Sequence, residues 1–448
     1  MSVNCVSDAE PGSGIAYASV MLMDGFPPTG DARVTLANWQ DPPFNRWSFS
    51  HMRELLPTQR ISRGSALVVP LACDPRPLAQ VRLRRVDDSE ADVDTVLNDT
   101  YTDAVVIVHS GRVVFERYVG ETARDTPHLL MSISKSVVSC VVGILVDRGL
   151  LSPAQLVIDH VPELAVSGYR TATIRNLLDM RSGVKFSEDY LDLNAEVRDM
   201  EEAMGWRPSS VIGFPQSMYA YLQALEQDRG HGGTFDYRSC ETDVLGWICE
   251  KATGTRMADL ISGLVWAPIN ADWDAEITCD GVGTAIHDGG MNATARDLAR
   301  FGMMLLADGT VDGRRVVPEE WLRTSWDVDA DVREAFARSA SGPSMPGGWY
   351  RNKFWFLPRR HGDVLVCLGI NGQMLYVSPA TGMVAAKMSS WPHAQSAAML
   401  HDTLLAFDAV GAALGAPDRP RQPGVPGVAA GMSRGRLHGP NSIARPPV

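Results

Sequence analysis

Residues 128–149 read HLLMSISKSVVSCVVGILVDRG. From Val137 to Val146 every residue is apolar or small, without alternation. A helix that is apolar on all sides belongs in the interior of a protein. Ser132 is a suitable N-cap and Gly149 a suitable C-terminal stop. The stretch therefore predicts a buried central helix that begins at Ser132.

Lys135 lies one turn into this helix, where burying an ammonium is costly unless the charge is paired or lost. The i, i+3 spacing places Ser132 and Lys135 on one helix face. A buried, partly neutral lysine can accept a serine's proton, and the helix N-terminus favours the developing negative charge. The pattern predicts Ser132 as nucleophile and Lys135 as base, with a chance match as the alternative. A second match, Ser182-Gly-Val-Lys185, runs into a polar stretch instead of a buried helix.

Composition narrows the functional classes. With 448 residues and 45% apolar content, the chain can form two domains, or one domain with an insertion. The net charge of −12 argues against nucleic acid or an anionic membrane as a partner. The seven cysteines are dispersed, which favours reduced thiols in a cytoplasmic protein. We expect neither a signal peptide nor a membrane span, because the N-terminus and the apolar runs lack those patterns.

Strand-rich ends around a helical middle predict an α+β fold. One antiparallel sheet would come from both chain ends, flanked by helices, with a mainly helical domain inserted. The expected parts are an extended N-terminal arm (1–60), a sheet domain (61–155 and 286–415), the helical insertion (156–285) and a disordered tail (416–448) rich in Pro, Gly and Arg.

The expected elements follow from periodicity and from turn residues. A hairpin is predicted from 104–108 and 112–118, and further strands at 353–357, 364–368, 373–377 and 383–387. Helices are predicted at 173–183, 195–205, 215–228, 240–252, 256–265, 294–308 and 394–414, and one begins at Ser152-Pro153.

Other catalytic motifs are weak or absent. Gly431-Met-Ser-Arg-Gly435 matches the hydrolase elbow, but it lies in the predicted tail without a strand or a helix. The sequence has no H-E-x-x-H and no P-loop, and a lone histidine such as His287 is interpreted as a satisfied structural residue. We therefore expect no metal and no cofactor.

Two further sites carry possible chemistry. Tyr237 precedes the helix at 240–252, where a rigid hydroxyl near an ammonium can relay protons. The alternative is a tyrosine that only packs by its ring. Gly369 interrupts a strand-rich run, which marks close approach of another backbone. A backbone N–H there and that of Ser132 would form a two-donor oxyanion hole, and a simple turn is the alternative.

Ser132-x-x-Lys135, Tyr237-x-Ser239 and the strand at Gly369 together form an ordered set. The set resembles the superfamily of serine β-lactamases, penicillin-binding proteins and class C-like esterases. Within it, the chain is most similar to the nylon-oligomer hydrolases, over about residues 36–410. Segments that carry this likeness are 39–47, 130–135, 188–190, 237–239, 369–373 and 389–392.

The resemblance implies roles for eight residues. The acylated nucleophile would be Ser132, with Lys135 as its base and Tyr237 as the proton relay. The amides of Ser132 and Ile370 would form the oxyanion hole.

The other four residues would contact substrate. Tyr190 would lie on a loop that closes over substrate and hydrogen-bonds the amide leaving group. Ser239 stands where β-lactamases have Asn. Glu201 and Asp288 fall at positions that tune activity on linear amides, and Glu201 could meet a substrate ammonium or be a plain surface residue.

The Lys-Thr-Gly motif of β-lactamases is absent, and Cys367-Leu-Gly369 occupies its place. The cation that would meet a β-lactam carboxylate is therefore missing. We expect a serine hydrolase that cleaves small linear amides of the 6-aminohexanoate-oligomer type and short-chain esters through an acyl-enzyme on Ser132. The alternatives are a carboxylesterase with little amidase activity and a non-catalytic binding protein. The resemblance also makes a homodimer plausible.

Overall fold

The computed structural model describes residues 21–209 and 217–415. The predicted tail at 416–448 and the match at 431–435 lie outside the described residues, as does the start of the predicted arm. The described residues belong to one compact unit, so the division into a sheet domain and an inserted domain stays a prediction.

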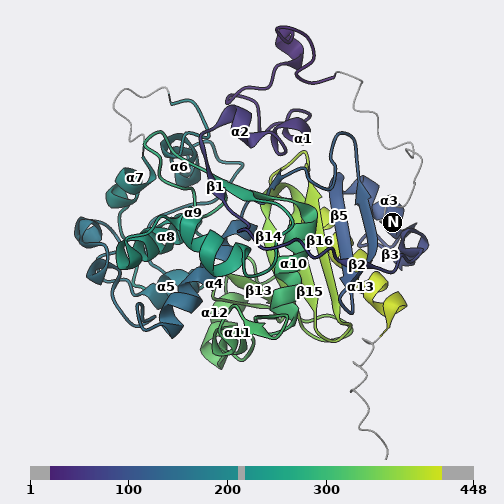
Figure 1. The fold of residues 1–448 in the computed structure, drawn as a ribbon. Helices are drawn as coiled ribbons and strands as arrows, with labels where there is room; N and C mark the ends of the chain where they lie inside the picture. The colour runs from purple at the N-terminus through teal and green to yellow at the C-terminus, as the bar shows by residue number, and fades with distance from the viewer. Residues whose placement is uncertain (1–20, 210–216, 416–448) are drawn as a thin grey trace, which may run out of the picture. The chain divides into compact units, whose positions relative to one another are not determined.

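An eight-stranded sheet joins strands from early and late in the chain (Figure 1). In sheet order the strands are β12 (Trp349–Arg351), β13 (Phe354–Leu357), β14 (Val364–Gly369), β15 (Gln373–Ser378), β16 (Met383–Ser389), β5 (Thr102–His109), β6 (Arg112–Tyr118) and β2 (Ala72–Cys73). All neighbours pair antiparallel except β2 and β6, which are parallel. The two parts of the chain meet at β16 and β5, which confirms the predicted α+β class.

Helices cover both faces of this sheet. Along β5, Val106 and Val108 belong to one hydrophobic core and Val105 and Ile107 to the other, as the two-residue repeat of a strand requires. On the first face, α10 (Ala295–Leu306) lies across β15, β16 and β5 (Figure 1), and α4 (Ile133–Asp147) contacts β14 and β15. On the second face lie α3 (Val93–Asp99) and α13 (Ala397–Leu414).

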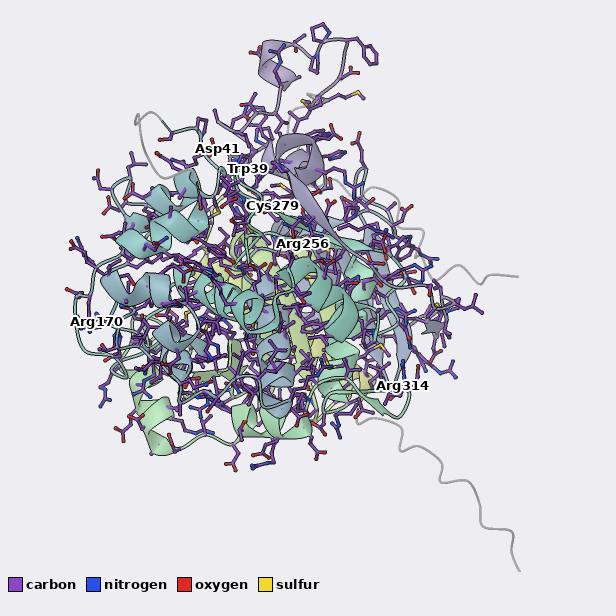
Figure 2. All side chains as sticks on the ribbon, turned by 60° about the vertical axis from the view of Figure 1, so that its left-hand side comes forward. Trp39, Asp41, Arg170, Arg256, Cys279 and Arg314 are labelled. Atoms are coloured by element: carbon purple, nitrogen blue, oxygen red, sulfur yellow. The ribbon has the colours of Figure 1, made fainter. Side chains whose placement is uncertain are left out.

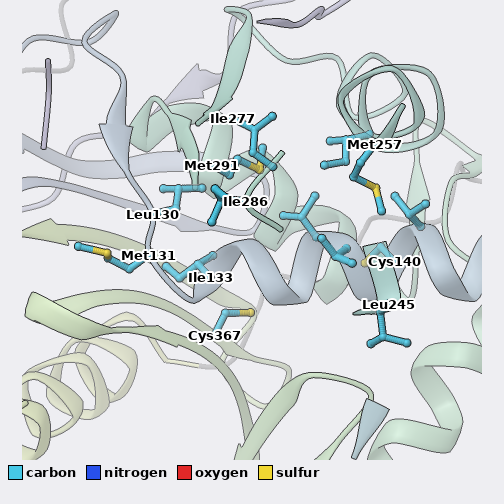
Figure 3. Close-up of a cluster of buried hydrophobic side chains, with 14 of the residues drawn as sticks. Leu130, Met131, Ile133, Cys140, Leu245, Met257, Ile277, Ile286, Met291 and Cys367 are labelled. Carbon is cyan, nitrogen blue, oxygen red and sulfur yellow. The ribbon is translucent and has the colours of Figure 1, made fainter. Parts of the chain in front are cut away.

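The central helix α4 is the predicted one. Each residue from Ile133 to Leu145 is buried, and Gly149 has a positive φ of 70° directly after the helix. Figure 3 shows α4 enclosed by side chains from several other elements. These side chains include Leu245, Met257, Ile277, Met291 and Cys367. Their burial explains why α4 is apolar on every side.

The middle of the chain is mainly helical. Its helices are α5 (Ile174–Leu178), α6 (Glu196–Ala203), α7 (Met218–Ala224), α8 (Cys240–Thr253) and α9 (Met257–Ile261), which continues as a π-helical segment, Ser262–Trp266. The helix expected at 173–183 has the predicted cap, Thr173, but ends at Leu178 because Met180 takes a positive φ of 54°.

The helix expected from Ser152-Pro153 is wrong. Only two short 3-10 segments, Val157–Asp159 and Pro162–Val166, follow those residues. Residues 156–157 instead pair with residues 172–173. Leu156 forms an isolated β-bridge with Thr173, and the Val157 amide donates to the Ala172 carbonyl oxygen.

A second sheet, which the sequence did not predict, leads into α4. Its order is β1 (Thr58–Ile61), β8 (Ala275–Thr278), β9 (Met291–Ala293) and β7 (His128–Leu129), all antiparallel. β7 ends three residues before Ser132. This sheet therefore fixes where the chain enters the central helix.

The remaining elements are short. They are α1 (Asn45–Ser48), α2 (Met52–Leu55), α11 (Glu319–Trp326), α12 (Ala330–Ala337), β3 (Arg82–Arg84), β4 (Glu90–Asp92), β10 (Thr310–Val311), β11 (Arg314–Arg315), and 3-10 segments at Gly30–Ala32, Leu78–Gln80 and Ile370–Gly372.

An aromatic anchor holds residues 21–60 to the rest of the unit. Trp39, labelled in Figure 2, is 1% exposed. Its indole N–H donates to the Trp206 carbonyl at 2.8 Å, and the two rings meet edge to face at 5.2 Å. The arm is thus pinned by its aromatics, as expected.

Two chemical expectations need correction or addition. Cys73 is disulfide-bonded, so the expected set of reduced thiols is wrong there, whereas the free cysteines of the described residues are buried: Cys140, Cys240, Cys249, Cys279 and Cys367. By length and composition, α13 is apolar enough to cross a membrane, with a mean hydropathy of 1.3. Such a signal is weak evidence, and Leu404, Phe407 and Val410 of α13 lie in the core of the second sheet face.

Candidate active site

Ser132 occupies the N-cap position of α4, but its side chain makes no capping hydrogen bond. Its hydroxyl oxygen instead accepts a hydrogen bond from Lys135 Nζ at 2.7 Å. Met131, directly before it, has a positive φ of 48°, a conformation that is uncommon outside glycine. The local backbone therefore places Ser132 at the helix start, and Lys135 follows it one turn along the helix.

Lys135 is 1% exposed and donates a second hydrogen bond, to the Asp288 carbonyl oxygen at 2.8 Å. Burial lowers the pKa of Lys135, but the electrostatic interactions with Tyr237, Asp288 and Glu188 oppose burial and leave the pKa above its ordinary value. The expectation that burial alone makes this lysine partly neutral is therefore wrong. In the structure, Lys135 Nζ donates to the Ser132 hydroxyl oxygen.

Tyr237 lies three residues before α8, and its hydroxyl is hydrogen-bonded to Ser132. Its ring stacks on Trp355 with 5.4 Å between centroids, and Lys135 Nζ lies 5.3 Å from its centroid. Burial raises the pKa of Tyr237, and the nearby Lys135 lowers it only in part. The Tyr237 ring packs against Trp355, as in the alternative of a tyrosine that packs by its ring. Its hydroxyl is also hydrogen-bonded to Ser132.

Gly369 brings the end of β14 against the chain before Ser132. A Cβ at Gly369 would lie 2.7 Å from the Leu130 carbonyl oxygen and 2.9 Å from Met131 Cβ. Glycine is therefore required by the close backbone approach that the sequence predicted. Ile370, the next residue, begins the 3-10 turn Ile370–Gly372 beside the start of α4. This arrangement fits an oxyanion hole built from the Ser132 and Ile370 amides.

Asp288 and Ser239 also lie at the site. Besides its carbonyl contact, Asp288 places Oδ2 3.5 Å from Lys135 Nζ. Ser239 donates from its amide and from its hydroxyl to the Glu188 carboxylate, at 2.7 and 2.8 Å. The same carboxylate accepts the Tyr190 hydroxyl at 2.8 Å. Glu188 is thus a site residue that sequence reasoning passed over, although its segment, Glu188-Asp-Tyr190, carried part of the family resemblance.

Glu201 is neither a surface residue nor a free acid. It is 3% exposed, and its Oε2 accepts hydrogen bonds from Arg198 at 2.8 Å and contacts Arg207 Nε at 3.0 Å. Arg198 also donates to the Tyr190 carbonyl oxygen. Two guanidinium groups thus pair with Glu201, and one of them, that of Arg198, also contacts the Tyr190 segment.

Two other sequence predictions have different outcomes. In the second Ser-x-x-Lys match, the buried Ser182 donates to Glu241, while Lys185 points outward and pairs with Glu196 at 3.6 Å. The serine and lysine of that match have separate partners, which supports the choice of Ser132. His287 is fully buried, and its ring nitrogens lie 3.7 Å from Asp243 Oδ1 and 4.0 Å from Glu250 Oε1, so that it is a satisfied structural histidine stays a prediction.

A family model described as Beta-lactamase matches residues 94–409, well over half of the chain. The chain belongs to the Beta-lactamase family. Among curated relatives, it is 38% identical over 396 residues to 6-aminohexanoate-dimer hydrolase of Paenarthrobacter ureafaciens, covering 86% of this chain and 97% of the relative. This member of the Beta-lactamase family is therefore an enzyme, a serine hydrolase of the amidase and esterase type.

Solved structures of Beta-lactamase-like proteins agree with this assignment. A candidate 6-aminohexanoate-dimer hydrolase from Bacillus anthracis superposes with a TM-score of 0.79 at 25% identity, covering 88% of this chain and all of that one. EstCE1, a hydrolase with promiscuous acyltransferase activity, has a TM-score of 0.56 at 15% identity, covering 71% of this chain and 97% of that one. The second likeness shows the fold alone.

Within this Beta-lactamase fold, Cys367 stands on β14 where the Lys of Lys-Thr-Gly was expected. Its thiol is fully buried and hydrogen-bonds with Ser136 of α4. Burial raises the pKa of this thiol to about 12. Cys367 is therefore a neutral core residue, and it supplies no cation to the site.

Proposed function

We propose that the protein hydrolyses small linear amides, of the 6-aminohexanoate-oligomer type, and short-chain carboxylic esters through an acyl-enzyme on Ser132. One observation carries the proposal: the Ser132 hydroxyl oxygen lies 2.7 Å from Lys135 Nζ and is hydrogen-bonded to the Tyr237 hydroxyl. A serine held by two proton-transfer groups is the arrangement that nucleophilic catalysis requires.

In the proposed acylation step, Lys135 in its deprotonated form takes the Ser132 proton as the serine oxygen attacks the substrate carbonyl. The carbonyl oxygen becomes an oxyanion, which accepts hydrogen bonds from the Ser132 and Ile370 amides. The bond to the leaving group then breaks. Tyr237 gives its proton to the departing amine or alkoxide and recovers one from the Lys135 ammonium. Water repeats the sequence on the acyl-enzyme and releases the acid.

The Tyr190 hydroxyl is proposed to bind the leaving group of an amide. It donates to Glu188 at 2.8 Å, so its oxygen lone pairs are directed elsewhere and can accept an amide N–H. Glu201 would support this contact indirectly through Arg198. The 38% identity to a 6-aminohexanoate-dimer hydrolase supports the same substrate class.

The experiment treats the intact protein with a fluorophosphonate probe and measures the intact mass. We expect one adduct on the native protein and none on Ser132→Ala. Ser182→Ala is the matched control, because Ser182 is the serine of the second Ser-x-x-Lys match, and it should label like the native protein. No adduct on the native protein, or equal labelling of Ser132→Ala, would refute the assignment.

A substrate pair separates amidase from plain esterase. Hydrolysis of the 6-aminohexanoate dimer is measured beside that of p-nitrophenyl acetate with the same enzyme. Cleavage of both supports the proposal, whereas cleavage of the ester alone identifies a carboxylesterase. The cytoplasmic location and the homodimer stay predictions, to be tested by cell fractionation and light scattering.

A further inference from the structure

Lys135 is oriented by a backbone acceptor that comes from a distant part of the chain. Its two short hydrogen bonds go to the Ser132 hydroxyl at 2.7 Å and to the Asp288 carbonyl at 2.8 Å. A flexible four-carbon side chain keeps its ammonium in one place only if its acceptors are themselves held in place. What holds the Asp288 carbonyl therefore decides where the base lies.

Asp243 holds the segment that carries this carbonyl. It lies in the first turn of α8 and is fully buried. Its Oδ1 accepts the His287 amide at 2.9 Å, and its carboxyl group also accepts the Asp288 amide. One side chain thus binds two successive backbone N–H groups, directly before the carbonyl that accepts from Lys135.

The His287 imidazole also packs closely against α8. A Cβ at Gly246 would lie 2.2 Å from His287 Nδ1, so the imidazole fills the space of a missing side chain on α8. In Figure 3, Ile286 and Leu245 of α8 lie on opposite sides of α4, and α4 contacts α8.

We propose that Asp243 is a positioning residue for Lys135, which acts by fixing the main chain at Asp288. The inference rests on the proposed function, because it assigns Asp243 to the same acylation step. Tyr237 lies three residues before α8 and Asp243 in its first turn, so the start of one helix carries both the proposed proton relay and the residue that holds the acceptor of the base. The hydrogen bonds of the Asp243 carboxyl are to main-chain N–H groups of the 287–288 segment, so its proposed action on Ser132 is indirect.

Asn is a suitable conservative variant. Burial raises the pKa of the Asp243 carboxyl, and the adjacent Asp288 carboxylate raises it further. A neutral amide of the same shape keeps one oxygen acceptor for the His287 and Asp288 amides. Ala removes the acceptor and leaves both N–H groups without it.

The chain offers a matched control. Asp297, in the first turn of α10, is also fully buried and also holds two successive amides, those of Asp272 at 2.6 Å and Trp273 at 3.1 Å. Its remaining hydrogen bonds are to Thr294. Asp297→Ala therefore removes the same kind of support at a place that does not contact Lys135.

The experiment measures kcat and KM for p-nitrophenyl acetate at a temperature where circular dichroism shows every variant folded. We expect Asp243→Ala to lower kcat about 10- to 100-fold, as for a small misplacement of a catalytic group. KM should change by no more than about threefold, because substrate contacts persist. Asp243→Asn and Asp297→Ala should keep kcat within about threefold of the native value.

Three outcomes would overturn the inference. They are a near-native kcat for Asp243→Ala, equal losses for Asp243→Ala and Asp297→Ala, and a loss for Asp243→Asn as large as that for Asp243→Ala. If Asp243→Ala does not fold, Asp243→Ser replaces it, because its hydroxyl is too short to reach both amides. A native protein that neither hydrolyses the ester nor labels at Ser132 would instead refute the proposed function.

Discussion

Gly369 lies directly against the Leu130 backbone, because a Cβ at Gly369 would come within 2.7 Å of the Leu130 carbonyl oxygen. Leu130 lies two residues before Ser132, the proposed nucleophile, so this contact joins β14 to the start of α4. The distance between the two proposed oxyanion donors depends on it.

Gly369→Ala should therefore lower kcat about 10- to 100-fold for esters and amides alike, since the added methyl pushes the two amides apart. Gly263→Ala is the control, because a Cβ there meets nothing within 4 Å. Steady-state kinetics on p-nitrophenyl acetate provide the measurement. An unchanged kcat for Gly369→Ala would mean that these two amides do not form the oxyanion hole.

The pH dependence follows from the two proton-transfer groups. Burial lowers the pKa of Lys135, but the electrostatic interactions with its neighbours raise it above its ordinary value, and burial raises the pKa of Tyr237. Both groups hold their protons at neutral pH, and the serine can only transfer its proton to a deprotonated base. We expect kcat/KM to rise from about pH 6 to 9, approaching tenfold per pH unit. A profile that is flat or falls above neutrality would contradict this assignment.

Tyr237→Phe should distinguish leaving groups. An amine must be protonated as it departs, whereas p-nitrophenolate needs no proton. We expect hydrolysis of the 6-aminohexanoate dimer to fall about 10²- to 10⁴-fold and that of the p-nitrophenyl ester to fall much less. Tyr350→Phe is the control, because Tyr350 is a buried neighbour with its ring centroid 6.1 Å from that of Tyr237. Equal losses on both substrates would exclude Tyr237 as the donor to the leaving group.

Lys387, a buried lysine away from the candidate active site, should make the free energy of unfolding depend on pH. Lys387 on β16 is fully buried and donates to the Thr100 carbonyl at 3.1 Å and to the Ser389 hydroxyl. Burial lowers the pKa of Lys387 to about 7, against an ordinary value near 10.5. Between these two values the unfolded chain binds more protons than the folded one, so the free energy of unfolding rises with pH.

Lys387→Met should therefore flatten the rise in unfolding free energy between about pH 7 and 9.5. At lower pH, the protonation of Lys387 reduces the free energy of unfolding of the native protein by about 5 kcal/mol at most, and the variant removes this loss. Urea denaturation at a series of pH values measures the difference. Lys251→Met, which changes a lysine whose side chain is 41% exposed, should keep the native slope. An identical slope in Lys387→Met would show that Lys387 stays charged in the folded state.

Sequence alone determined the features that depend on near neighbours in the chain. The i, i+3 spacing of Ser132 and Lys135 predicted one shared helix face, and the uninterrupted apolar run predicted that this helix is buried. The hairpin, the late strands and the cap at Thr173 followed from equally local signals. These predictions succeeded because dihedral preferences and side-chain periodicity are set within a few residues.

Only the tertiary structure decided what surrounds the catalytic pair. The pKa of Lys135 depends on burial and on Tyr237, Asp288 and Glu188, which come from separate segments, so no local pattern shows whether burial or attraction prevails. Glu201 was placed by resemblance, but its arginine partners were not. The sheet that contains β7 was missed because its strands are two to four residues long and their pairing is non-local. The sequence thus indicated the candidate catalytic residues, whereas packing determined their surroundings and their orientation.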